Sequence, residues 1–202
     1  MEATVTLERK LDGEKAQRIV AAMRESVGTR GAAGSTFDVV AREAGVSRGL
    51  LHYYFGSKER LLVEVVRRDC DARIAALEDA LARAKSVDEV VATLVASLED
   101  FVEDEPASSA VVYEMVSASH HSEELRAEMA ELYRRWRGHL ADVLRTKRDE
   151  GVVSLDADPE AVASIIFALG DGIGLQLFSD PAWDGSDALE LGARTARRLL
   201  GG

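Results

Sequence analysis

Apolar residues recur at three- and four-residue intervals through most of this chain, which is the spacing of one face of an α-helix. Alanine, leucine, valine, glutamate and arginine dominate the composition, and only three prolines are present, which favours helices over a large sheet. We therefore expect an all-α protein. The pattern predicts helices over about 13–27, 36–44, 47–55, 58–85, 87–105, 107–118, 122–150, 159–178 and 186–200.

Residues typical of helix ends support several of these boundaries. Ser86 and Glu89 form a capping box at the start of one helix. Asp158 followed by Pro159 is a strong helix start, because proline suits the first helical position. The glycines of GTRGAAGS (28–35) predict a loop after the first helix, and residues 1–12 predict a loose arm.

The stretch 36–58, TFDVVAREAGVSRGLLHYYFGSK, has the spacing of a helix-turn-helix. Ala41 is the small residue where the two helices would touch, Gly45 is the turn glycine, and Leu51 is the apolar anchor of the second helix. Ser47 is placed to cap that second helix with its hydroxyl. The motif predicts a compact three-helix head whose last helix is free to enter the major groove of DNA.

Polar side chains on the outer face of the second helix separate this hypothesis from an ordinary αα-hairpin. A hairpin would explain Gly45 as a helix stop. It would not explain an outer face made of Arg48, His52 and Tyr53, all of which can bond bases or phosphates.

Charge is divided unevenly along the chain. A net charge of −11 disfavours DNA binding by the chain as a whole, but residues 1–60 carry ten Lys/Arg against eight Asp/Glu, a balance of +2. Residues 61–202 carry a balance of −13. Since phosphate attraction is screened beyond about 10 Å at ordinary salt, this division permits the N-terminal head alone to bind DNA.

Targeting signals and disulfides are not expected. No apolar run in the sequence approaches the roughly 20 residues of a membrane span, and the N-terminus lacks the apolar core of a signal peptide. The single cysteine, Cys70, cannot form an internal disulfide, which suits a reducing compartment. We expect a cytoplasmic protein without a membrane partner.

The helix predicted at 159–178 is apolar on nearly all sides. Such a helix is either central in its own domain or shared between subunits, and its place near the end of the chain favours a homodimer interface built with the helix at 186–200. Two glycines four residues apart would permit close helix approach. The candidate interface residues are Ile166, Leu169, Gly170, Ile173, Gly174 and Leu177.

The run STFDVVAREAGVSRGLLHYYFGSKERLL (35–62), followed by a wholly helical remainder, resembles the TetR family of transcriptional regulators. The resemblance implies a DNA-binding domain at 1–57 and a ligand-binding and dimerisation domain at 58–202, coupled by the long helix that begins at Lys58. It departs where Leu50 replaces a common threonine and His52 a common tyrosine, which leaves the operator sequence open. The residues that it assigns to DNA contact are Thr36, Arg48, Gly49, His52, Tyr53, Tyr54 and Lys58.

The resemblance also implies a repressor that leaves a palindromic operator when a small molecule, of unknown identity, binds the C-terminal domain. Large or polar residues on apolar stripes are the candidates for its cavity, although each would also fit as plain core. Asp171 stands out because a buried carboxylate needs a partner. The candidates are Phe101, Tyr113, Met115, Trp136, His139, Phe167 and Asp171.

Two other classes of protein, an enzyme and a helical adaptor, fit the sequence less well. An enzyme with a metal site at His120, His121, Glu123 and Glu124 is disfavoured, because these residues fit no recognised ligand spacing and read better as a solvated loop. We expect no metal, no cofactor and no catalytic activity. A helical adaptor that binds only protein would explain the acidic body but not the outer face at Arg48.

Overall fold

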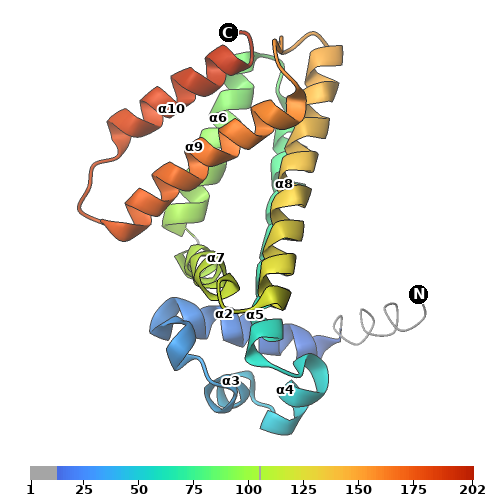
Figure 1. Cartoon of the computed structure of the whole chain (residues 1–202), viewed down its shortest axis with the longest axis vertical. Helices are drawn as coiled ribbons and strands as arrows, with labels where there is room; N and C mark the ends of the chain where they lie inside the picture. The colour runs from blue at the N-terminus through green and yellow to red at the C-terminus, as the bar shows by residue number, and fades with distance from the viewer. Residues whose placement is uncertain (1–12, 105) are drawn as a thin grey trace. The chain divides into compact units, whose positions relative to one another are not determined.

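Helices make up all the regular structure in the part of the chain that the computed structural model describes, residues 13–104 and 106–202 (Figure 1). The predicted all-α class is confirmed, whereas the arm predicted at 1–12 lies outside the described residues. The helices are α2 (Glu14–Gly34), α3 (Phe37–Ala44), α4 (Arg48–Phe55), α5 (Lys58–Arg83), α6 (Val87–Glu99), the π-helix η1 (Asp100–Asp104), α7 (Pro106–Ser119), α8 (Glu123–Asp149), α9 (Pro159–Ser179) and α10 (Ser186–Leu199).

Packing divides the chain into two compact units. The described residues of the first are 13–70 and 106–130, and those of the second are 71–104 and 131–202. The long helices α5 and α8 each contribute to both units. Helix α7 packs along α2 and therefore belongs to the first unit. The functional division predicted at residue 57 stays a prediction.

The first unit contains the predicted helix-turn-helix. Thr36 caps α3, its hydroxyl oxygen accepting the Val39 N–H at 3.4 Å. Gly45 ends α3 at φ 66°, the left-handed conformation expected of the turn glycine. Ala41 and Leu51 are buried, and α3 packs against α4. Ser47 is the N-cap residue of α4, but its hydroxyl makes no capping hydrogen bond, contrary to prediction.

The loop predicted at 28–35 is wrong. Helix α2 continues through Gly28 to Gly34 and is interrupted only at Gly31, where φ 69° and ψ 169° produce a kink. Each glycine costs a helix only about 1 kcal/mol relative to alanine. Burial of Val27 and Ala32 stabilises the helix against this cost, although the glycines favour a loop. The pattern of local residues could not reveal these tertiary contacts.

Helix α9 belongs to the core of the second unit. Asp158 caps it by accepting the N–H groups of Glu160 and Ala161, and Pro159 occupies the first turn as predicted. Side chains of α5, α6, α8, α9 and α10 form the core. Its buried apolar members are Leu81, Ala84, Val90, Val91, Leu140, Ala141, Leu144, Val153, Val162, Ala163, Ile166, Ala196 and Leu200.

The expectation that no segment approaches membrane length needs correction. Among the described residues, α9 alone is long and apolar enough to cross a membrane by length and composition. Asp171 and three weakly hydrophobic glycines interrupt its apolar sequence and conceal this property. One such helix is only weak evidence for a membrane span, because the core helix of a soluble protein can have the same length and apolar composition.

A buried lysine joins α8 to the end of α5. Lys147 is 1% exposed, and its ammonium group donates to the carbonyls of Ala82 and Ala84 at 3.0 Å each. A third hydrogen bond reaches the carboxylate of Glu150 at 2.9 Å and is the main reason the pKa of that carboxyl is lowered. All three donors of the ammonium are therefore satisfied, and the last carbonyls of α5 have a charged partner.

We predict that Lys147→Met lowers the free energy of unfolding by about 2–4 kcal/mol, because two carbonyls lose their donor. Urea unfolding at fixed protein concentration measures the change. Lys85→Met is the matched control, since Lys85 is exposed, and it should change stability by less than about 0.5 kcal/mol. Equal stability of the two variants would refute the capping role of Lys147.

Candidate functional site

The outer face of α4 presents polar side chains, while Leu51 and Phe55 on its other face are buried. Tyr53 is 61% exposed and Arg48 is exposed as well. Tyr54 is half-buried and packs edge-on against the Tyr53 ring, with the centroids 5.3 Å apart. The helix therefore has an anchored face and a face available for contact.

Arg48 is paired with an acidic residue from α3. One terminal nitrogen of its guanidinium lies 3.0 and 3.3 Å from the two carboxylate oxygens of Asp38. A guanidinium has five N–H donors, so this pairing leaves donors for a bidentate contact with guanine. Asp38 sits in the first turn of α3, where its charge also favours the helix dipole.

His52 is held in a defined orientation. Its Nδ1 lies 3.1 Å from the carbonyl oxygen of Gly56, and its ring packs edge-on against Phe37, with the centroids 4.9 Å apart. Because a carbonyl oxygen only accepts, Nδ1 carries the proton, and Nε2 is the atom left for another partner.

Two of the predicted phosphate contacts also hold helix ends. The Thr36 hydroxyl caps α3, and Lys58 donates to the carbonyl of Ala32 near the end of α2 at 2.6 Å. Together with Gly49 at the start of α4, all seven predicted DNA-contact residues belong to one helix-turn-helix and the first turn of α5. Their contacts with DNA stay predictions.

The second unit contains a partly open cavity of about 130 Å³. It includes five of the seven predicted ligand residues: Phe101, Trp136, His139, Phe167 and Asp171. Tyr113 and Met115 lie on α7 in the other unit and do not line it, because their apolar stripe packs within the first unit. The complete lining is Arg73, Ile74, Leu77, Glu78, Leu81, Leu94, Ser97, Leu98, Phe101, Trp136, His139, Leu140, Val143, Ile166, Phe167, Gly170 and Asp171.

Aromatic rings and carboxylates occur together in this cavity. The rings of Trp136 and Phe167 are nearly parallel, at 21° and 6.2 Å between centroids. Tyr133 packs edge-on against Trp136 and hydrogen-bonds Asp171. Although Asp171 reaches solvent, desolvation by its surroundings raises the pKa of its carboxyl, and the Tyr133 hydrogen bond opposes this only in part.

Sequence reasoning missed two charged lining residues on α5. The guanidinium of Arg73 lies 4.4 Å from the centre of the Phe101 ring and donates to the Ser97 carbonyl at 3.0 Å. Glu78 approaches His139, with its Oε1 2.6 Å from Nε2 but outside hydrogen-bond geometry. The sequence did offer a signal for these two residues: Arg73 and Glu78 directly adjoin the apolar residues Ile74 and Leu77 of α5.

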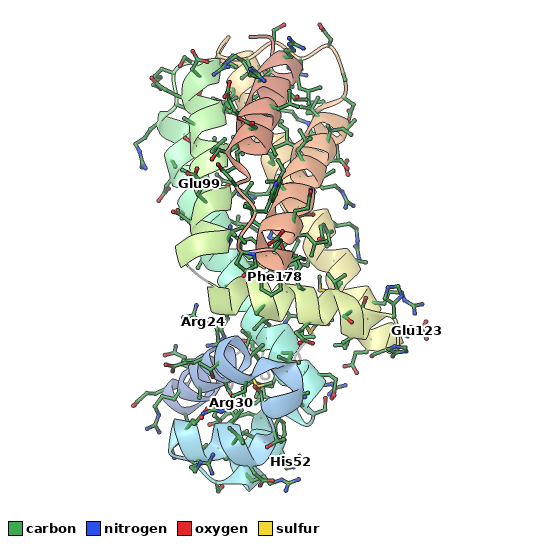
Figure 2. All side chains as sticks on the ribbon, turned by 90° about the vertical axis from the view of Figure 1, so that its left-hand side faces the viewer. Arg24, Arg30, His52, Glu99, Glu123 and Phe178 are labelled. Atoms are coloured by element: carbon green, nitrogen blue, oxygen red, sulfur yellow. The ribbon has the colours of Figure 1, made fainter. Side chains whose placement is uncertain are left out.

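The candidate interface residues on α9 lie mainly toward the inside of the second unit. Ile166 and Gly174 are buried within the chain, and Leu169, Gly170, Ile173 and Leu177 are half-buried. The large apolar side chains that α9 and α10 expose are neighbours of these: Ile165, Leu175, Phe178 and Leu191. Figure 2 shows Phe178 near the end of α9.

No metal centre is found at the histidines. Within residues 13–104 and 106–202, no three His, Cys, Asp or Glu side chains are grouped to hold an ion.

Models of two protein families match separate segments of the sequence. A model of bacterial regulatory proteins of the tetR family matches residues 19–65. A second model, of the C-terminal domain of BetI-type transcriptional repressors, matches residues 86–201, which is more than half of the chain.

Curated relatives and solved structures agree with these matches. The HTH-type transcriptional regulator BetI of Rhizobium meliloti is 30% identical over 159 residues, 77% of this chain and 73% of that protein. BetI of Agrobacterium fabrum is 47% identical over 49 residues, only 24% of either chain. A TetR-family regulator from Rhodococcus sp. superimposes with a TM-score of 0.77 at 25% identity, covering 93% of this chain and 99% of the other.

Two structures of similar fold contain ligands. A transcriptional regulator from Saccharomonospora viridis in complex with choline has a TM-score of 0.71 at 22% identity, covering 90% of this chain and 93% of that one. FadR of Bacillus subtilis in complex with stearoyl-CoA has a TM-score of 0.74 at 19% identity, covering 92% and 98%. At these identities the likeness concerns the fold alone.

We predict that Arg48→Ala and Lys58→Ala weaken DNA binding in different ways. Loss of Arg48 should cost about 1–3 kcal/mol on the preferred sequence and relax the preference at one base position per half-site. Loss of Lys58 should weaken binding to all sequences alike and reduce the salt dependence by about one phosphate contact. Binding to randomised duplexes at several salt concentrations measures both effects.

Thermal unfolding provides the control, because Lys58→Ala also removes the hydrogen bond to Ala32. The division of roles would be refuted if both variants, shown to be folded at the assay temperature, lost affinity equally on every sequence.

Proposed function

Because this chain belongs to the TetR family of DNA-binding transcriptional regulators and carries a BetI-type C-terminal domain, we propose that it is a repressor controlled by a small molecule. Its dimer binds a palindromic operator and releases it when the effector occupies the cavity of the second unit. The family consists of regulators rather than enzymes, so catalysis is not part of this function. Its place of action is the cytoplasm.

The polar face of α4 carries the DNA-binding part of the proposal. Arg48, His52 and Tyr53 lie outward on a short helix whose opposite side is anchored by Leu51 and Phe55. This is the arrangement that a recognition helix needs in the major groove. An adaptor that binds only protein, the main alternative, would have no use for it.

Exposed apolar side chains on α9 and α10 support dimerisation. The two helices run side by side in opposite directions (Figure 1), and Leu191 and Ile165 remain 57% and 50% exposed. Burying this face against its copy would remove apolar surface from water and form a four-helix bundle. We assign the interface to this outward face, rather than to buried Ile166 and Gly174.

The chemistry of the cavity favours a small organic cation as effector. Trp136 and Phe167 offer aromatic faces, and the carboxylates of Glu78 and Asp171 outnumber the one arginine, Arg73. Aromatic faces with nearby negative charge suit a quaternary ammonium group. The choline found in the structurally similar regulator from Saccharomonospora viridis agrees with this class. An acyl-CoA, with its several phosphates, would meet more negative than positive charge here.

We predict that selection from genomic upstream DNA recovers a two-fold symmetric site whose half-site centres lie about 34–36 Å apart. Leu191→Glu places a charge on the proposed interface and should weaken binding to the full site by about 100-fold, while an isolated half-site is little affected. Fluorescence anisotropy and analytical ultracentrifugation measure binding and assembly.

Ala127→Glu is the matched control, because it adds the same charge at an exposed position of α8. Absence of any symmetric site in the effector-free protein at low salt would overturn the repressor proposal. A fully dimeric Leu191→Glu variant would overturn the interface alone.

We predict that choline affinity rises with pH through the range in which Asp171 ionises. The Asp171 pKa is raised in the free protein, and a bound cation would lower it, so binding releases a proton between the two pKa values. Affinity should increase by up to about tenfold per pH unit there and level off above the raised pKa. Titration calorimetry from the usual carboxyl range, about pH 4, up to about pH 8 tests this.

Asp171→Asn should remove this pH dependence and weaken choline binding at neutral pH by about tenfold. Asp142→Asn, at an exposed position of α8, is the control. A choline affinity that stays constant or falls as pH rises would overturn the contact between the cation and Asp171.

A further inference from the structure

A second cavity, of about 70 Å³, adjoins the first inside the same unit. It lies among α6, α9 and α10, and every residue that lines it is aliphatic or glycine. Four residues line both cavities: Leu94, Leu98, Ile166 and Gly170. The wall between the two spaces is therefore no thicker than a few shared side chains.

Gly170 marks the weakest point of that wall. A Cβ atom at this position would meet no heavy atom within 4 Å, so no side chain fills the space there. Glycine in a helix interior costs about 1 kcal/mol relative to alanine, and no close approach within the subunit requires it at this position. The missing side chain leaves empty space at a position that borders both cavities.

The two cavities differ in chemistry. The first contains Arg73, Glu78, His139 and Asp171, whereas the second has no polar side chain at all. Such a division suits a molecule with a polar or charged end and an apolar end.

We propose that the second cavity is a binding site for an alkyl arm of the effector. The effector is then an amphiphilic organic cation, whose ammonium group lies near Asp171 and whose unbranched chain passes Gly170. This proposal rests on the function proposed above, because it takes the cationic end of the effector to occupy the first cavity. It goes further by naming a hydrocarbon chain that choline lacks.

The test compares ligands of increasing chain length on the full-length protein by titration calorimetry. Tetramethylammonium probes the first cavity alone, and the ethyl, butyl and hexyl trimethylammonium ions add the arm. Affinity should rise about fourfold per methylene until the second cavity is full, and then level off. The neutral alcohols 1-butanol and 1-hexanol probe the apolar site without a cation.

Two variants locate the arm. Ala193→Leu fills the second cavity without touching the first, and Gly170→Val fills the empty space that borders both. Ala193→Leu should bind tetramethylammonium as the unmodified protein does, within about twofold, because Ala193 does not line the first cavity. In both variants the ratio of hexyltrimethylammonium to tetramethylammonium affinity should lose the gain with chain length. Ala127→Leu, on the exposed surface of α8, should keep that gain. Thermal unfolding shows whether each variant folds. If one of Ala193→Leu and Gly170→Val does not fold, the binding data of the other still test the proposal.

The outcomes separate this inference from the proposed function. Tetramethylammonium binding without any gain from longer chains would overturn the alkyl site and leave the cationic effector standing. A gain that persists in both folded variants would also overturn it, because the chain would then bind elsewhere. A chain-length gain for the alcohols, lost in the variants and without binding of tetramethylammonium, would support the apolar site and overturn the cationic effector.

Discussion

Removing the apolar surface of α9 from water is the requirement on which the second unit depends. Val162 and Ala163 satisfy it inside the core, while Ile165 and Leu175 remain exposed on the opposite side. On the same inner side as Val162 and Ala163, Ile166 and Gly170 border both cavities. One helix therefore supplies core, cavity wall and outward apolar surface at once. This explains why it resembles a membrane span in composition.

In the DNA-binding unit, polar groups that would contact the operator already have partners within the chain. Arg48 pairs with Asp38, His52 with the Gly56 carbonyl, and Lys58 with the Ala32 carbonyl. When one of these groups binds DNA, it gives up its partner within the chain. The net gain in binding free energy is therefore much smaller than the energy of the new contact alone. Sequences that satisfy the groups poorly are then disfavoured, because a group that has left its internal partner stays unpaired.

Local signals in the sequence were sufficient for most of the fold, and long-range packing accounts for what they missed. Gly45, Ser86 and Asp158 set helix ends by chemistry within a few residues, and the structure agrees with each. The continuation of α2 past Gly28 depends instead on packing against α7, which no local window contains. The prediction that Tyr113 on α7 lines the cavity failed for the same reason. Periodicity identifies the apolar face of a helix but not the helix against which that face packs. Gly170, a candidate interface residue, lines a cavity within the chain. Periodicity alone could not tell the inner face of α9 from its outer face.

Control of DNA binding by an effector requires that the effector bind two arrangements of the protein unequally, however tightly it binds either one. The cavity is suited to this because its lining comes from several helices: Glu78 from α5, Phe101 from η1, Trp136 from α8 and Asp171 from α9. A ligand that contacts all four is sensitive to small shifts between them. Two of these helices, α5 and α8, also contribute to the unit that contains α4. Linkage is reciprocal, so operator DNA must weaken the effector by the factor with which the effector weakens DNA. Any effector-dependent repressor built on this chain is therefore as much a DNA-dependent receptor for its ligand.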